Sequence, residues 1–199
     1  SIAARGRKMA RWAADYLVYS RAPWDVQRLI EVVAEAGIET LDRFCTGSTL
    51  VVAVDDTSLR KTGKAITAAR WLRDPLSPPF HLNLRWGLRY LHMALILPLH
   101  QRSMDPRALS IDFTLAPSVK KPGKKATDEQ RAQYKEAQKQ HNLSTVAIAR
   151  FQHLREYLDS IGQAARTILM VGDGSFTNRK ILKSLPDRVE YLGRTRGDL

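Results

Sequence analysis

Two aspartates follow runs of apolar residues in this sequence. Asp55 comes directly after Thr49–Val54, and Asp173 comes one glycine after Thr167–Val171. Both runs are rich in β-branched residues, which is typical of strands that are buried on both faces of an α/β sheet. Functional groups gather where such strands end. If the two strands are neighbours, the carboxylates of Asp55 and Asp173 face each other across a short gap.

Two carboxylates held this close repel each other, and a divalent cation relieves the repulsion. Mg²⁺ takes hard oxygen ligands, and a pair of such ions about 4 Å apart can activate a nucleophile and stabilise the leaving oxygen of a phosphoryl displacement. The pair therefore predicts phosphodiester chemistry with Mg²⁺ or Mn²⁺. Taken singly, each aspartate has a structural explanation, because Asp55-Asp56-Thr57 and Asp173-Gly174-Ser175 are also good turn sequences.

The charge of the chain favours a polyanionic partner. Lys and Arg number 32 against 20 Asp and Glu, a net charge of +12, and residues 49–199 carry +11 of it. A field of this sign attracts nucleic acid. The charge does not gather on one amphipathic helix and no apolar run is long enough to span a bilayer, so we expect no membrane partner. The single cysteine excludes an internal disulfide framework and fits a reducing cytoplasm.

The periodicity of apolar residues predicts the elements that position the two aspartates. We expect helices at 9–22, 24–36 and 39–44, with Gly37 ending the second. We expect strands at 49–54, 65–72, 84–97, 167–171 and 188–193, a long helical stretch at 128–161 with an interruption near 142–144, a short helix at 177–185, and irregular structure at 101–126. The order predicts an α/β fold, with a three-strand antiparallel meander, then parallel strands, flanked by helices. We divide the chain into a helical N-terminal region, 1–48, and a catalytic domain, 49–199.

Two blocks of residues resemble a known family. Val54-Asp55-Asp56-Thr57-Ser58-Leu59 with Lys61-Thr62-Gly63-Lys64 resembles the first catalytic block of bacterial insertion-sequence transposases of the DDE class. Met170–Phe176, followed by Asn178, Leu182 and Tyr191–Arg196, resembles their second block. The resemblance covers residues 49–199. It implies a ribonuclease H-like domain, cut-and-paste cleavage and strand transfer of double-stranded DNA at transposon ends, two magnesium ions and a homodimer in the synaptic complex.

The same resemblance assigns the metal ligands. Asp55 and Asp173 match the family's first two acids, and Asp56 is the alternative to Asp55. Because side chains alternate along a strand, we expect Asp56 to point away from the site. The family's third acid is a Glu on a later helix, and we expect it beyond residue 199. Tyr191, Arg194 and Asp198 reproduce the spacing of the third motif, but they fall on a predicted strand.

The basic residues near these blocks are candidate DNA contacts. They are Lys61, Lys64, Lys120, Lys121, Lys124, Lys125, Arg194 and Arg196. Each could neutralise a phosphate, and the alternative for each is an ordinary solvated surface charge. We assign Trp71 and Trp86 to the core, with base stacking as the alternative.

Three other functions fit parts of the sequence. The chain could be a non-catalytic basic DNA-binding domain that descends from a transposase, or another ribonuclease H-like nuclease. It could also be a nucleotide- or methyl-donor-binding enzyme that uses Gly172–Ser175 as a glycine loop, although no third glycine completes that fingerprint.

Overall fold

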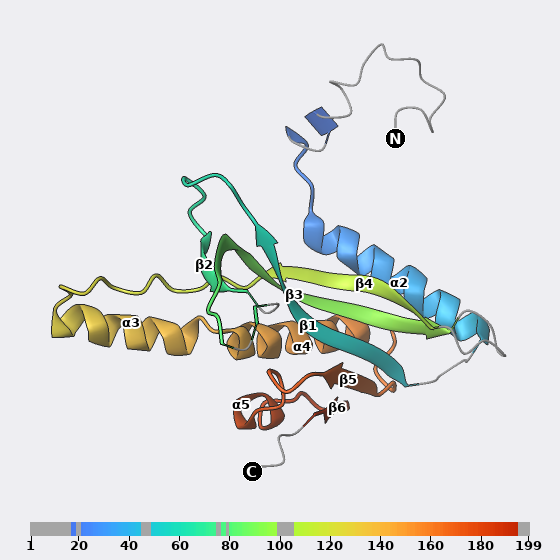
Figure 1. Cartoon of the computed structure of the whole chain (residues 1–199). Coiled ribbons are helices and arrows are strands. Elements are labelled where there is room, and N and C mark those ends of the chain that lie inside the picture. Colours follow the sequence, from blue (N-terminus) through green and yellow to red (C-terminus); the bar gives the residue numbers. More distant parts are fainter. Residues whose placement is uncertain are drawn as a thin grey trace.

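A curled mixed sheet runs through the molecule, and two helices follow each other in one line along it (Figure 1). The computed structural model describes residues 17–18, 21–44, 49–74, 77–78, 80–98 and 106–194. Most of the predicted helix 9–22 lies outside these residues. The helices are α2 (Val26–Phe44), α3 (Asp128–Gln140), α4 (Leu143–Ser160) and α5 (Arg179–Leu182). The strands are β1 (Leu50–Arg60), β2 (Arg70–Arg73), β3 (Leu84–Pro98), β4 (Pro106–Leu115), β5 (Ile168–Gly172) and β6 (Val189–Gly193).

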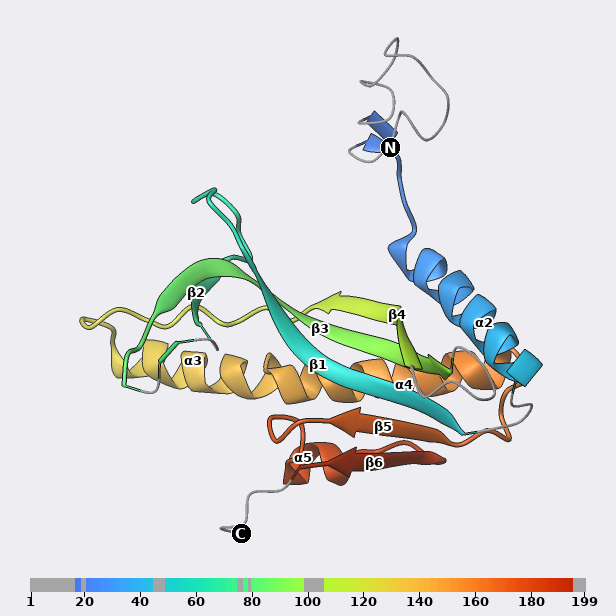
Figure 2. The same ribbon diagram turned by 45° about the vertical axis from the view of Figure 1, so that its right-hand side comes forward.

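The sheet has the strand order β2-β3-β1-β5-β6, and β4 also pairs with β3. β1, β2 and β4 are all antiparallel to β3, whereas β5 is parallel to β1 and β6 is parallel to β5 (Figure 2). The predicted α/β class with a mixed, partly parallel sheet is confirmed. The meander differs from the prediction, because β1 pairs with β3 and the four-residue β2 pairs only with the first part of β3.

Alternate residues of β1 build the core. Leu50, Val52 and Val54 are at most 3% exposed and face the helices, while Val51 and Ala53 between them are half-buried. The core includes residues from α2, α4 and the α5 segment, such as Ile38, Phe151 and Ile181. Burial of this apolar surface is the main force that holds β1 and β5 side by side. Among the described residues, no helix is long and apolar enough to cross a membrane.

α2 runs without a break through Gly37, where the sequence predicted an end. Gly37 is buried, and a side chain at this position would meet the ends of Leu109 and Leu95 at 2.7 and 3.0 Å. The glycine therefore allows α2 to approach β4 and β3 closely, and tertiary packing overrides its low helix propensity. The predicted break in the long helical stretch is confirmed. Asn142 caps α4 by accepting a hydrogen bond from the Thr145 N–H at 2.9 Å.

β4 lies in a segment that the sequence predicted to be irregular. Its pairing with β3 shifts between Met93 and Ala94, where Asp112 and Ser110 are their partners. This bulge adds one residue, Ile111, to β4. Ile111 and the next residue, Asp112, are consequently both buried, at 4% and 1% exposure. A regular strand would turn the Asp112 carboxylate to the opposite face.

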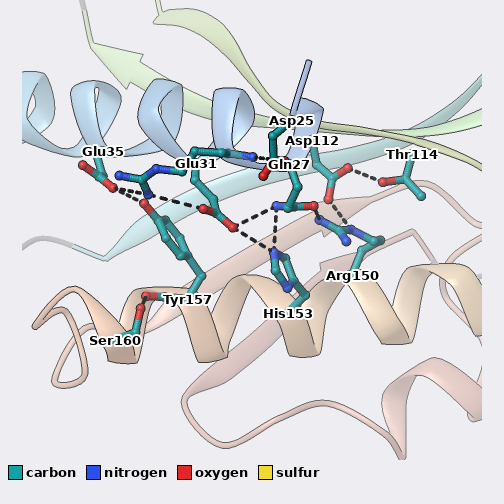
Figure 3. A network of polar contacts seen from close by, with 11 residues as sticks. Asp25, Gln27, Glu31, Glu35, Asp112, Thr114, Arg150, His153, Tyr157 and Ser160 are labelled. Atoms are coloured by element: carbon teal, nitrogen blue, oxygen red, sulfur yellow. Dashed lines mark hydrogen bonds and ion pairs between the residues drawn. The ribbon is translucent and has the colours of Figure 1, made fainter. Parts of the chain in front are cut away.

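The buried Asp112 carboxylate is paired with α4. Arg150 donates to it from Nε at 2.5 Å, and the Thr114 hydroxyl donates to its other oxygen at 2.5 Å. Arg150 Nη2 also donates to the Gln27 side chain of α2 at 2.9 Å (Figure 3). A buried carboxylate needs such partners. The ion pair therefore links β4 to α4, and the hydrogen bond to Gln27 links α4 to α2.

Further polar contacts join α2 to α4. His153 lies within hydrogen-bond distance of Gln27 and 3.7 Å from Glu31, and the Tyr157 hydroxyl donates to Glu35 (Figure 3). Burial and the charge of Glu35 raise the pKa of Tyr157 to about 12. These contacts align α2 with α4 over the sheet.

Candidate functional site

The register of β1 and β5 brings Asp55 and Asp173 to adjacent positions. Val54 is the partner of Gly172 in the parallel pair, and each aspartate follows its strand partner by one residue. Neighbouring strands are about 4.8 Å apart. Both aspartates are exposed and both line one open cleft of about 520 Å³. The predicted juxtaposition of the two strand ends is confirmed. The cleft is lined by Asp55, Asp56, Thr57, Ser58, Leu72, Arg73, Arg85, Arg89, Asp173 and Ser175.

Asp55 lies on the face of β1 that points away from the helices, because Val54 faces the core and side chains alternate. One of its carboxylate oxygens accepts a hydrogen bond from the Asp56 N–H at 2.8 Å. Within the described part of the chain, no Lys or Arg forms an ion pair with it. Its negative charge is therefore available to a cation in the cleft.

Asp56 lies on the opposite face of β1 but is also in the cleft wall. Its carboxylate accepts a hydrogen bond from Arg89 Nε at 2.7 Å, an ion pair in which both side chains are partly buried. Alternation thus turns Asp56 to the other face of β1, as expected, but Asp56 still lines the cleft. β1 and β3 are strongly curled (Figure 2), and the residues that line the cleft include neighbours from both faces of β1. Asp55 and Asp56 differ in their partners, because Arg89 neutralises the charge of Asp56.

Asp173 begins the turn that leaves β5. Its carboxylate accepts hydrogen bonds from the Ser175 N–H at 2.8 Å and from the Ser175 hydroxyl at 3.3 Å. The turn role that the sequence allowed for Asp173 is thus real, although the N-cap of α5 is Asn178. Each carboxylate oxygen can accept two hydrogen bonds or ligand contacts. The turn therefore fixes the carboxylate in the cleft and leaves it capacity to bind a cation.

The ring of Tyr191 packs behind this turn. Gly172 and Gly193 lack side chains where the ring lies, and a Cβ at either position would overlap it. The Tyr191 hydroxyl is 3.5 Å from the Asp173 carbonyl oxygen. Burial raises the pKa of Tyr191; a hydrogen bond with Thr177 opposes this shift, and the charge of Asp173 adds to it. Tyr191 supports the turn from below and lies outside the cleft wall.

Three arginines that the sequence analysis did not single out line the cleft: Arg73, Arg85 and Arg89. Arg85 donates to the Ser58 hydroxyl and lies 3.7 Å from Asp74. Arg85 and Arg89 are four apart on β3, so they share one face of that strand. Their presence on one face of a predicted strand could have indicated the cleft, because buried strands rarely carry charged residues.

The basic residues predicted from the sequence lie in different places. Lys61 lines a second cleft next to the first, and Lys64 is exposed beyond it. Lys120, Lys121, Lys124 and Lys125 are exposed in the segment before α3. Arg194 is exposed after β6, and its carbonyl oxygen is near Gly174 of the Asp173 turn. Arg196 and Asp198 lie outside the described residues. The structure therefore brings the two strand-end aspartates together, while none of these described cations lines the cleft that holds them.

The donor set suits a cation that brings ligands of its own. Mg²⁺ is often held by one or two carboxylates, with water and substrate phosphate completing its shell. Asp55 and Asp173 offer two carboxylates at one open edge. Among the residues that the structure describes, no three His, Cys, Asp or Glu side chains group so that they could hold a metal ion. The residues fit one ion shared with a phosphate group.

Comparisons with known proteins add no relative. No protein-family model, curated protein or solved structure matches the chain.

Proposed function

We propose that the protein is a DNA transposase of the DDE class, which cleaves phosphodiester bonds at the cleft that Asp55 and Asp173 line. The single observation that carries the proposal is the meeting of Asp55 and Asp173 in one open, arginine-lined cleft. The sequence blocks around these residues support the class, and the net charge of +12 supports a nucleic acid as the substrate.

The strand arrangement supports a ribonuclease H-like fold. Such a domain has three antiparallel strands followed by parallel strands, with the first strand at the centre of the sheet. Here β4, β3 and β1 are antiparallel in this order, and β5 and β6 continue the sheet in parallel beyond β1. The helices α3 and α4 connect the two parts.

Asp55 and Asp173 would hold the divalent ion, Mg²⁺ or Mn²⁺, with Asp56 as the alternative to Asp55. When bound, the ion supplies a Lewis acid that activates water and offsets charge on the reacting phosphate. Arg73 and Arg85 lie in the same wall and would orient the phosphate through charge-assisted hydrogen bonds. Arg89 would hold the Asp56 carboxylate in place through its ion pair. We expect a second ion to need a third carboxylate, as the resemblance implies.

The remaining parts of the proposal rest on the resemblance. Double-stranded transposon ends and target DNA are the expected substrates, a freed 3′-hydroxyl is the expected nucleophile of strand transfer, and a homodimer is the expected synaptic form. The exposed lysines before α3 would add contacts to phosphates.

A second candidate function is DNA binding without catalysis. It is favoured by the lack of a three-residue metal-binding group in the described part of the chain. Another ribonuclease H-like nuclease would use the same cleft, and its substrate preference would distinguish it.

The test is nicking of supercoiled DNA by the purified complete protein in the presence of Mg²⁺ or Mn²⁺. Asp55→Asn and Asp173→Asn should each abolish nicking, because an amide is neutral and a poorer ligand for a hard cation. Binding to duplex DNA should persist, because each variant removes a negative charge that would repel the DNA phosphates.

Asp187→Asn is the matched control, because Asp187 is exposed and lies outside the cleft. It should nick as the unchanged protein does. Asp56→Asn distinguishes the alternative ligand: if it alone abolishes nicking and Asp55→Asn does not, the ligand is Asp56. Normal nicking by Asp173→Asn would refute the site. DNA binding without nicking by the unchanged protein would favour the non-catalytic function.

A further inference from the structure

A second cleft, of about 590 Å³, adjoins the first and carries aromatic side chains. It is lined by Arg60, Lys61, Thr62, Trp71, Asp74, Asn83, Leu84, Arg85 and Trp86. Arg85 lines both clefts, so the two cavities share a wall. A polymer that crosses the first cleft can therefore continue into the second.

Trp71 is the unusual residue of this cleft. It was assigned to the core from the sequence, but it is 65% exposed. It pairs with Trp86 across β2 and β3, with ring centroids 5.8 Å apart and an interplanar angle of 60°. Exposed tryptophan is costly because its large apolar surface stays in water. Its position in a cleft indicates a ligand with a flat apolar face.

The aromatic wall is held in place before any ligand binds. Trp86 Nε1 donates to the Gly63 carbonyl oxygen at 2.9 Å, and the Lys61 N–H donates to the Trp86 carbonyl oxygen at 2.9 Å. Gly87 lets β3 pass close to Leu59 of β1, because a Cβ there would overlap the Leu59 carbonyl oxygen. Trp86 therefore contacts the Trp71 ring, and 65% of the Trp71 surface stays exposed.

The charges around the tryptophans select among flat ligands. Arg60, Lys61 and Arg85 are cationic, and among the described residues of the wall the only acid is Asp74, which is 3.7 Å from Arg85. The surplus of positive charge opposes a cationic ligand and favours a polyanion. A strand of nucleic acid combines flat bases with phosphates, and tryptophan stacking with flanking cations is how proteins bind unpaired bases. Bases that remain paired in a duplex cannot offer their faces to an indole.

We propose that this tryptophan cleft, defined by Trp71, Trp86, Arg60 and Lys61, binds an unpaired stretch of DNA next to the cleavage site. A base stacks on the open face of Trp71, and the two cations contact the adjoining phosphates. The proposal rests on the proposed function for its substrate, DNA, and adds that the DNA is unpaired at this point.

The test measures binding of a short single-stranded DNA oligonucleotide and of a duplex of the same sequence, by fluorescence anisotropy with EDTA present. Trp71→Ala should weaken single-strand binding about 5- to 150-fold, which corresponds to the loss of one stacked base. Duplex binding should be unchanged, which also shows that the variant is folded. Trp71→Phe should restore most of the single-strand affinity.

Trp24→Ala is the control, because Trp24 is a second exposed tryptophan, 50% exposed, that precedes α2 and lines neither cleft. It should bind both DNAs as the unchanged protein does. Equal binding of single strands by Trp71→Ala and the unchanged protein would overturn the inference. Equal loss of single-strand and duplex binding would also overturn it. EDTA removes divalent ions, so this binding assay does not depend on cleavage. If single-strand binding depends on Trp71 but the protein does not nick DNA in the presence of Mg²⁺, the proposed function is refuted and the inference about the tryptophan cleft is not.

Discussion

Asp55 and Asp173 differ in how their carboxylates are held. Asp173 is fixed by two hydrogen bonds within its turn, whereas Asp55 has one, from the next N–H along β1. Both positions could be predicted, because each aspartate follows an apolar strand. The Arg89 partner of Asp56 could not be predicted, because it depends on the register of β1 against β3. That register is a tertiary property.

In the core, Asp112 also has a partner that the sequence alone does not predict. Apolar and polar residues alternate from Leu109 to Leu115, which indicates a strand, but alternation alone places Asp112 on the side away from Ile111. The bulge opposite Met93 and Ala94 brings Asp112 to the core side, where Arg150 neutralises it. A single added residue therefore decides whether this carboxylate is solvated or buried.

Tyr157 leads to a prediction about alkaline pH. Burial and Glu35 raise its pKa from 10.0 to about 12 in the folded protein. The neutral phenol therefore stabilises the folded state below pH 10, and this contribution is lost as the pH rises from about 10 to about 12. In urea unfolding across this range, the unchanged protein should lose more stability than Tyr157→Phe, which has no phenol to ionise. Parallel losses in the two proteins would contradict the assignment.

At the scale of elements, β1 and β5 were predicted well because their runs of β-branched residues need burial on both faces. β1 continues to Arg60, six residues past its predicted end, because its polar second half still pairs with β3. β2 is shorter than predicted because only Arg70–Arg73 meets β3. Pairing partners, which local sequence does not specify, set both lengths.

The packing of α2 on the sheet gives a second prediction. Gly37→Val would place a branched side chain against Leu109 and Leu95. The overpacking should destabilise the protein by about 1–3 kcal/mol, and valine's better helix propensity than glycine would offset only a few tenths. Urea unfolding measures the change.

Ala36→Val is the control on the exposed side of the same helix. It should cost about 0.5 kcal/mol, the difference in helix propensity. If both variants lose equal stability, the close approach of α2 to β4 and β3 is not significant for the fold.

At the scale of the whole molecule, the sheet brings together residues that are more than a hundred positions apart. β1 and β5 are neighbours because β3 and β4 occupy one side of β1 and leave the other to β5. The net charge predicted a polyanionic partner, and the order of the elements predicted the α/β class and its mixed sheet. The two clefts could not be predicted, because they form where β1, β2 and β3 curl together.

We propose that Asp55 and Asp173 jointly bind one divalent cation. The most direct test is titration of the protein into Mn²⁺, with free Mn²⁺ followed by electron paramagnetic resonance. The unchanged protein and Asp187→Asn should remove Mn²⁺ from solution, while Asp55→Asn and Asp173→Asn should each lose this binding. Binding of Mn²⁺ by both of these variants as tightly as by the unchanged protein would contradict the claim.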